Sequence, residues 1–281
     1  ILALIILFLI KNKISEKKFT NIKQRIFTWF VIIILFYLAT MSKIYLLLLF
    51  VLISTLAFKE FLQFAYIKYN SELMITSIVV NLAFYLGIYF KNLYVLLILF
   101  ILIALRFYKR AFIIFAFFIT TYLIGSISYI DDLNFIINYM ILIELNDVFQ
   151  YISGNIFGER KITPNISPNK TVEGLIGGMI LTTLTAALLK YIFHINYQIK
   201  FIPYLALIGF FGDIFISALK RKVNLKDSGT LLLGHGGILD RVDSLIFTAP
   251  IILFIFKYSS FFIFSLLETQ YSILFGEILL I

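Results

Sequence analysis

The chain has 281 residues, of which 62% are hydrophobic and 14% charged. Soluble domains carry about 25% charged residues, so this composition indicates a protein whose main solvent is the lipid bilayer. The formal charge of +9 is the excess expected of cytoplasmic loops, and no soluble basic face for a nucleic acid is visible. With no cysteine and two histidines, disulfides, thiolate metal sites and all-histidine zinc sites are excluded.

Apolar runs follow one another along the chain, and a spanning helix needs about 20 apolar residues. The runs begin near Ile1, Ile26, Ile44, Leu73, Leu93, Ala111, Phe135, Val172, Phe201 and Ser244. The sequence therefore predicts an all-α polytopic integral membrane protein with about nine to ten transmembrane helices. We divide it into N-terminal transmembrane helices, 1–135, and a C-terminal region, 136–281, with polar loops at 153–171 and 220–243.

The distribution of lysine and arginine predicts the orientation of these helices. Basic residues crowd the segment 11–25, the loop around Arg106, the 153–171 loop and the 220–243 loop. Simple alternation of the helices puts all four on one side, and the remaining loops carry little positive charge. The positive-inside rule makes that side cytoplasmic, so both polar loops are expected to face a water-soluble ligand there.

Asp213 is an ionisable residue within an apolar run, and such residues are functional by default. Helical spacing places it on one face with Ser217, Lys220 and Arg221. This face is typical of a metal ligand below a phosphate-binding rim. The alternative is a structural ion pair between Asp213 and a lysine.

Asp240 and Asp243 lie three residues apart, on one face if a helix has begun there. Carboxylates of this kind suit Mg²⁺, which binds one or two of them together with substrate phosphates. They equally suit the first turn of a helix, where acidic residues complement the macrodipole.

The polar segment between these helices contains a glycine-rich turn, Gly234-His-Gly-Gly237, and the dipeptide Lys226-Asp227. Consecutive backbone N–H groups in such a turn can form an anion-binding nest, with Gly236 and Gly237 facing the ligand and His235 as a phosphate donor. Lys226 would neutralise phosphates together with Lys220 and Arg221. The alternatives are a flexible turn and ordinary loop charge.

A third polar group lies upstream, where Glu144, Asp147 and Tyr151 share one helix face. The segment Ile166-Ser-Pro-Asn-Lys-Thr-Val-Glu-Gly174 follows. We interpret Ser167-Pro168 as a turn, Glu173 as an acidic first-turn residue of the next helix, and Lys170 as a phosphate contact. A plain helix-entry turn explains all of this segment except Lys170.

Together these motifs resemble the signature of phosphatidate cytidylyltransferases (CDP-diacylglycerol synthases). The resemblance rests on Ser217-x-x-Lys220-Arg221, Lys226-Asp227 and His235-Gly-Gly-x-x-Asp240-Arg241-x-Asp243, with Asp147 and the 166–174 segment upstream in the expected order. It covers residues 140–265, roughly. Leu233 stands where the family usually has proline or a small residue, and Asn146-Asp147-Val148 replaces the usual Ser-Asp-Thr.

The resemblance implies a nucleotidyltransferase that makes CDP-diacylglycerol and pyrophosphate from CTP and phosphatidic acid in the bilayer. It implies Mg²⁺, with room for a second cation, and a homodimer in a bacterial inner membrane. By this resemblance, Asp213, Asp240 and Asp243 are metal ligands. Asp213, Asp240, Asp227, Lys226 and His235 are catalytic. Asp147, Lys170, Ser217, Lys220, Arg221, Gly236, Gly237 and Arg241 bind substrate.

Two other functions fit the same residues. A CTP-dependent polyprenol or dolichol kinase would transfer the γ-phosphoryl group instead. A membrane transporter would use Asp213, Glu144 and Asp147 as an ion relay, although this leaves the glycine-rich turn and the basic cluster without a purpose.

Overall fold

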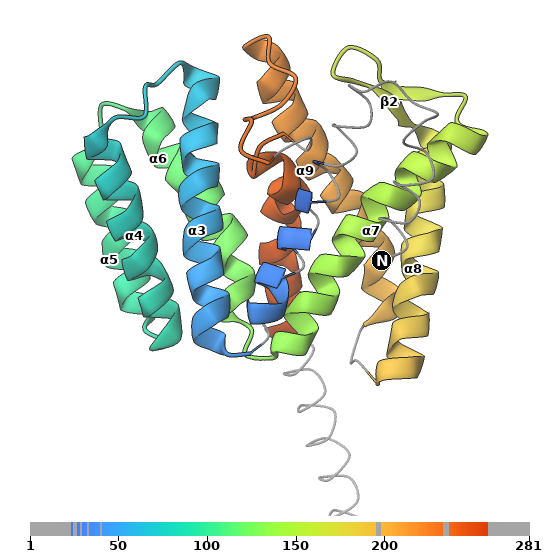
Figure 1. Cartoon of the computed structure of the whole chain (residues 1–281), viewed down its shortest axis with the longest axis horizontal. Coiled ribbons are helices and arrows are strands. Elements are labelled where there is room, and N and C mark those ends of the chain that lie inside the picture. The colour runs from blue at the N-terminus through green and yellow to red at the C-terminus, as the bar shows by residue number, and fades with distance from the viewer. Residues whose placement is uncertain are drawn as a thin grey trace, which may run out of the picture.

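The structure is a computed structural model, and it describes residues 24, 27–28, 30–32, 34–39, 41–194, 198–232 and 236–257. Its main helices are α3 (Lys43–Leu62), α4 (Ser71–Tyr89), α5 (Leu93–Arg106), α6 (Ala111–Phe117), α7 (Leu133–Phe157), α8 (Val172–Phe193) and α9 (Ile202–Lys222). A further helix occupies residues 239–257 and is called the 239–257 helix below. These helices confirm the all-α fold, and eight of the predicted apolar runs coincide with them (Figure 1).

Short segments connect these helices. Single 3₁₀ turns lie at Gln63–Ala65, Ser126–Tyr129 and Ile199–Phe201, and α6 continues into a π-helical segment, Phe118–Leu123. The predicted run at Ile1 and the apolar stretch after Phe261 lie outside the described residues.

Polar caps decide where the helices begin in this nearly uniform apolar sequence. Asn70 accepts a hydrogen bond from Leu73 N at 2.9 Å, Asp132 from Phe135 N at 2.9 Å, and Thr171 from Gly174 N at 3.1 Å. Ser42 and Asn92 cap α3 and α5 in the same way. Each cap satisfies a backbone donor that the first helical turn leaves unpaired, so hydropathy sets the helices and these residues set their ends.

The segment between α7 and α8 corrects one prediction. Helix α7 continues to Phe157, and a two-stranded antiparallel hairpin follows, formed by β1 (Lys161–Thr163) and β2 (Ser167–Thr171). Ser167-Pro168 therefore lies in a strand, and the turn falls at residues 164–166. The hairpin has one partner strand only, so the missing N–H of Pro168 costs little there. Glu173 lies in the first turn of α8 as expected.

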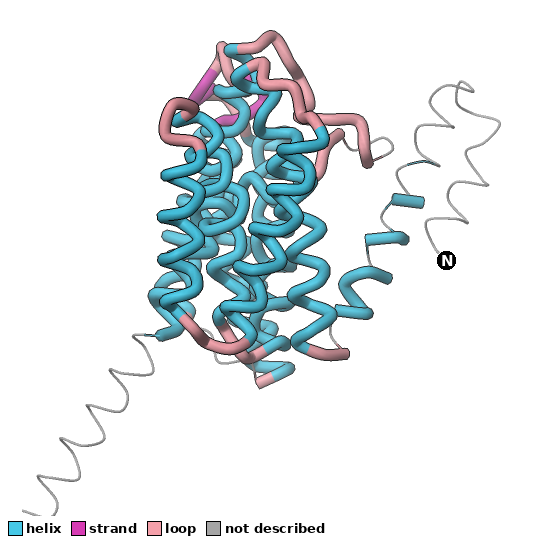
Figure 2. The backbone as a smooth tube through the Cα atoms, turned by 90° about the vertical axis from the view of Figure 1, so that its left-hand side faces the viewer, coloured by secondary structure: helices cyan, strands magenta, loops and turns pink. Residues whose placement is uncertain are grey.

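Successive helices run up and down, so that alternate connections meet at the same end (Figure 1, Figure 2). One end, the hairpin end, carries the hairpin and residues 63–70, 107–110, 223–232 and 236–238. Arg106 and Glu72 form an ion pair there. At the opposite end, Asp131 pairs with Lys91 at 2.6 Å and with Lys43 at 3.8 Å. Both polar segments thus lie at one end, as simple alternation predicts.

Five helices are long and apolar enough to cross a membrane: Lys43–Ala65, Ser71–Tyr89, Leu133–Phe157, Val172–Phe193 and Ile199–Lys222. Leu93–Arg106 and Ala111–Leu123 are shorter apolar helices. Large apolar side chains cover their outer faces, as at Leu105 and Leu184. A water-soluble protein rarely exposes so much contiguous apolar surface, so the protein is a membrane protein. The number of nine to ten spans and the division at residue 135 stay predictions.

Glycines allow the C-terminal helices to approach closely, as small residues commonly do in membranes. A Cβ on Gly174 of α8 would lie 3.0 Å from Gly154 Cα of α7. On α9, a Cβ on Gly212 would lie 2.5 Å from the carbonyl oxygen of Asp243 and 3.2 Å from Ser244 Cα. This contact fixes the distance between Asp213 on α9 and Asp243 on the 239–257 helix.

We expect Gly212→Ala to destabilise the protein by about 1–3 kcal/mol, because the added methyl group meets backbone atoms that cannot rotate away. Gly209→Ala, on the same helix, is the matched control, since its added Cβ would meet only Ser244 and Thr248 of the 239–257 helix, at an ordinary contact distance of 3.5 Å. Thermal unfolding in detergent should show a lower Tm for Gly212→Ala only. Equal Tm values for the two variants would contradict this account of the packing.

Candidate active site

Three carboxylates from three helices gather around one lysine from the hairpin. Lys170 Nζ lies 2.7 Å from Asp213 Oδ2 and 3.8 Å from Asp147 Oδ1, and it donates to Gln150 Oε1 at 3.2 Å. Asp243 on the 239–257 helix is near enough for its charge to interact with those of Asp213 and Asp147. We call Asp147, Lys170, Asp213 and Asp243 the acidic cluster. Helices far apart in sequence thus bring together residues that the sequence singled out.

Neighbouring hydroxyl groups orient the carboxylates of this cluster. Ser217 Oγ donates to Asp213 Oδ1 at 3.2 Å, as expected from the predicted helix face. Ser244 Oγ donates to Asp147 Oδ2 at 3.1 Å. Asp147 Oδ1 is buried without a hydrogen-bond partner. A buried acceptor left open in this way is available to a ligand or an ion.

The electrostatic balance of the cluster keeps Lys170 charged. Burial lowers the pKa of Lys170, but the carboxylates of Asp213 and Asp147 outweigh this effect, so the pKa stands above its ordinary value of 10.5. The ammonium group also lies 5.3 Å from the ring centroid of Phe210, within cation–π range. At neutral pH the cluster therefore contains a fixed cation among its carboxylates.

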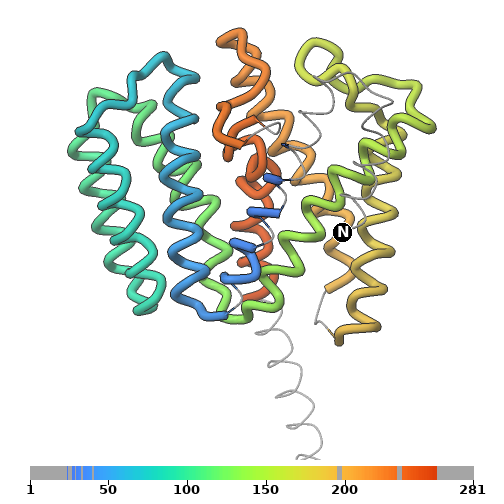
Figure 3. Tube along the Cα trace, viewed as in Figure 1, coloured from blue at the N-terminus to red at the C-terminus, as the bar shows by residue number. Residues whose placement is uncertain are grey.

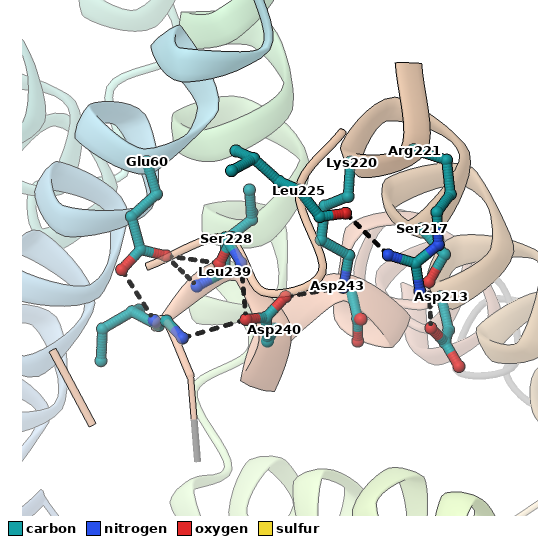
Figure 4. Close-up of polar contacts among 12 residues, drawn as sticks. Glu60, Asp213, Ser217, Lys220, Arg221, Leu225, Ser228, Leu239, Asp240 and Asp243 are labelled. Atoms are coloured by element: carbon teal, nitrogen blue, oxygen red, sulfur yellow. Dashed lines mark hydrogen bonds and ion pairs between the residues drawn. The ribbon is translucent and has the colours of Figure 1, made fainter. Parts of the chain in front are cut away.

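A second buried pair joins α9 to the 239–257 helix. Lys220 Nζ lies 2.8 Å from Asp240 Oδ1, and both side chains are less than a tenth exposed (Figure 4). Asp240 Oδ2 accepts hydrogen bonds from Ser228 N at 2.8 Å and Gly237 N at 2.9 Å. Both oxygens of Asp240 thus have partners in the protein, which leaves this carboxylate less acceptor capacity for a ligand than Asp147 has.

Three consecutive backbone N–H groups at the end of the glycine-rich turn form a nest, and protein carboxylates occupy it. The N–H group of Gly237 donates to Asp240, and the N–H groups of Ile238 and Leu239 both donate to Glu60. Gly236 has φ +85°, a backbone conformation that glycine adopts readily. His235, like Leu233 and Gly234, lies outside the described residues.

The remaining predicted residues lie at the rim of this site. Arg221 donates to Ile166 O at 3.1 Å and to Leu225 O at 2.7 Å, which ties α9 to the hairpin. Lys226 and Asp227 are exposed, and Arg241 is half-buried. Asp227 adjoins Gly236, where an added Cβ would lie 3.3 Å from Asp227 Cβ. We call Arg221, Lys226 and Arg241 the basic rim, and their binding of phosphates stays a prediction.

Two residues of the site were not predicted. Glu60 comes from α3 in the N-terminal half and contacts the segment between α9 and the 239–257 helix. Gln150 lies one helical turn beyond Asp147 and accepts from Lys170. No sequence pattern singled out Glu60, because a carboxylate at the end of an apolar run resembles ordinary loop charge and its partners are distant in sequence.

The donor set fits Mg²⁺ in one of its common binding modes. All candidate ligands are carboxylate oxygens, which hard cations prefer, and the open Asp147 Oδ1 faces into the cluster. Within the described part of the chain, no three acidic or histidine side chains are placed to hold one metal ion together. The residues thus suit a cation held by one or two carboxylates and by substrate phosphates, rather than an all-protein cage.

The fold and site define an all-α membrane protein with acidic and basic groups collected at one end of its helices. A model of the cytidylyltransferase family matches residues 23–259. The chain therefore belongs to the cytidylyltransferase family. The matched range includes both the acidic cluster and Glu60.

Three relatives illustrate the similarity. The phosphatidate cytidylyltransferase of Rickettsia felis is 46% identical over 127 residues, which are 42% of this chain and 56% of the relative. That of Bacillus subtilis is 39% identical over 127 residues, 44% of this chain and 47% of the relative. The Escherichia coli K12 protein named "Uncharacterized protein YnbB" is 44% identical over 120 residues, 42% of this chain and 40% of the relative. The chain spans about half the length of these relatives.

We expect Lys220→Met to destabilise the protein by about 3–5 kcal/mol, because it leaves the buried carboxylate of Asp240 without its cation. Lys222→Met, on the exposed side of the same helical turn, should cost less than about 0.5 kcal/mol. Thermal unfolding in detergent compares them. A Tm for Lys220→Met within error of Lys222→Met would show that the pair carries no stability.

Proposed function

We propose that this protein is a phosphatidate cytidylyltransferase, which makes CDP-diacylglycerol and pyrophosphate from CTP and phosphatidic acid. The observation that carries the proposal is the acidic cluster itself, in which carboxylates of three helices surround Lys170 beneath a basic rim. Family membership supports a cytidylyl transfer, and the names of the Rickettsia felis and Bacillus subtilis relatives support phosphatidate as the acceptor.

The reaction needs charge neutralisation more than acid–base chemistry. A phosphate oxygen of the lipid forms a bond to the α-phosphorus of CTP, and the bond between that phosphorus and the oxygen bridging to the β-phosphorus breaks. The electron pair leaves with pyrophosphate. Because the attacking oxygen is already an anion, no general base is required, and catalysis rests on positioning and electrostatic stabilisation. This agrees with a site built from carboxylates and cations.

The described residues divide into two roles. Arg221 and Lys226 are exposed at the rim, where they would hold the triphosphate with Arg241. Lys170, buried among the carboxylates, would contact a phosphate oxygen close to the reacting phosphorus. Lys220 would act on the nucleotide only through long-range electrostatic attraction, because its ammonium group is paired with Asp240.

Magnesium is the cofactor we propose, with Asp213 and Asp243 as its holders and Asp147 beside them. When bound, it would neutralise phosphate charge and polarise the α-phosphate. Asp240, which the sequence suggested as a ligand, acts in our proposal by fixing the chain between α9 and the 239–257 helix.

The site is proposed to face the cytoplasm of a bacterial inner membrane. The hairpin end contains Arg106, Lys109, Arg110, Arg160, Lys161, Lys220, Arg221, Lys222 and Lys226. The opposite end has fewer basic residues, Lys43, Lys91, Lys190, Lys200 and Lys257, and the first two of them lie beside Asp131. This asymmetry supports the hairpin end as the cytoplasmic side, where CTP is present. A homodimer stays a prediction of the family resemblance.

We expect purified protein with phosphatidic acid and Mg²⁺ to transfer label from [α-³²P]CTP to a lipid. Asp213→Asn should lower the rate on the order of a hundredfold, because the cluster loses the charge that faces Lys170 and the cation. Asp131→Asn, at the opposite end of the helices, is the matched control and should retain the wild-type rate.

The same assay separates the alternatives by their products. A labelled lipid with release of pyrophosphate supports the proposal. Label retained in CDP, together with a phosphorylated prenol, would replace it with a kinase. Wild-type protein that forms neither product would leave the transporter as the better hypothesis.

Orientation can be measured because the chain has no cysteine. We expect Lys226→Cys to react with a membrane-impermeant maleimide only in inside-out vesicles, and Lys91→Cys only in intact cells. Both positions are exposed, at opposite ends of the helices. The reverse labelling pattern would place the site outside the cytoplasm.

A further inference from the structure

Glu60 is a buried carboxylate of α3, in the N-terminal half of the protein. It contacts the stretch between α9 and the 239–257 helix, which we call the polar segment here. It is 4% exposed and lies in the last turn of its helix. Its Oε2 accepts from Ser228 Oγ and Leu239 N, both at 2.8 Å, and its Oε1 accepts from Ile238 N at 3.0 Å (Figure 4). Three donors from a segment almost 180 residues away in sequence thus converge on one side chain.

The polar segment is shaped to enclose this carboxylate. A Cβ on Gly229 would lie 2.5 Å from Glu60 Oε1. A Cβ on Gly237 would collide with both Glu60 Oε2 and Ser228 Oγ. Close packing against Glu60 therefore explains why glycine stands at both positions, without any role in binding a ligand.

Glu60 and Asp240 hold the same stretch of chain from opposite sides. Asp240 accepts from Ser228 N and Gly237 N, while Glu60 accepts from the Ser228 hydroxyl and the next two backbone N–H groups. Figure 3 shows the α3 trace beside the orange segment that precedes the 239–257 helix. The start of that helix is consequently fixed to α3, and Asp243 follows one turn later.

The position of Asp243 relative to Asp213 depends on where the 239–257 helix begins. Glu60 accepts hydrogen bonds from N–H groups that have no acceptor within the helix itself, at a helix start where a negative charge is favoured. Without Glu60, the N–H groups of Ile238 and Leu239 would lose their acceptors, and the first turn of the helix would shift or fray. Displacements of about 1 Å at a reacting centre can lower rates by on the order of a hundredfold.

We infer that Glu60 is a positioning residue for the transfer reaction, acting through the start of the 239–257 helix rather than on substrate. The inference rests on the proposed function for its catalytic part and on hydrogen bonding alone for its structural part. It makes α3 a component of the catalytic unit.

The test compares Glu60→Gln, Glu60→Ala and Ser228→Ala with Glu72→Gln. Glutamine keeps the shape but leaves one backbone N–H without an acceptor, alanine removes all three acceptor contacts, and Ser228→Ala removes one donor. Glu72 is an exposed carboxylate at the hairpin end, paired with Arg106. Each variant is purified as the full chain, and kcat, KM for CTP and Tm are measured. Hydrogen exchange is followed in peptides covering Ile238 and Leu239.

We expect kcat to fall least in Ser228→Ala, more in Glu60→Gln and most in Glu60→Ala. The loss in Glu60→Ala should be on the order of tenfold to a hundredfold. KM for CTP should change by less than about twofold, since Glu60 touches no substrate. Exchange should rise at Ile238 and Leu239 in the Glu60 variants, while exchange in α7 and α8 stays unchanged. Glu72→Gln should match the wild type throughout.

Two results would overturn the inference. One is a wild-type kcat in folded Glu60→Ala. The other is a loss of activity that tracks a general fall in Tm, with exchange rising equally in all helices. If wild-type protein makes no CDP-lipid, the proposed function fails by itself. The exchange measurement then still decides whether Glu60 holds the helix start.

Discussion

The constraint on which this structure depends is the high free energy of a charge inside an apolar helical bundle. Several buried ionic groups are therefore paired: Lys170 with Asp213, Lys220 with Asp240, and Glu60 with three hydrogen-bond donors. Removing one partner of such a pair typically costs about 3–5 kcal/mol, whereas the intact pair adds little to stability. These residues are better explained by the geometry that they impose than by stability, because apolar residues would pack the same space at lower cost.

That geometry brings together elements that are distant in sequence. Asp147 lies on α7, Asp213 on α9 and Asp243 on the 239–257 helix, and the hairpin carries Lys170 between them. Asp147 and Asp213 lie near the middle of their helices, where Lys170 reaches them from the hairpin, and Gly212 lets α9 approach the 239–257 helix closely. The positions of the three carboxylates are thus a consequence of helix direction and small-residue packing, while the polar segments supply Lys170 and the rim.

Much of this arrangement could be predicted from the sequence, for identifiable reasons. Apolar runs located the helices because lipid-facing and buried surfaces are both apolar here, and Asn70, Asp132 and Thr171 mark their starts. Helical spacing aligned Ser217 with Asp213, which is a local relation. The strand at Ser167–Thr171 was missed, because a Ser-Pro pair usually marks a turn and its pairing with Lys161–Thr163 depends on the closed hairpin.

Glu60 shows what local patterns cannot reach. Its partners lie in the segment between α9 and the 239–257 helix, so no spacing rule connects them, and its position at the end of an apolar run resembles ordinary surface charge. The three-dimensional fold also changes how the glycine-rich turn is understood. Its N–H groups form a nest, but carboxylates of the protein fill it in this state.

This occupied nest implies that the two halves of the protein act as one unit. A C-terminal half without α3 would leave the N–H groups of Ile238 and Leu239 without acceptors, at a cost of about 1–3 kcal/mol for each buried donor. The family match over residues 23–259 agrees with this dependence, since it extends through α3 as well as the acidic cluster. The N-terminal helices therefore contribute more than membrane anchorage, because one carboxylate of α3 determines where the helix carrying Asp240 and Asp243 begins.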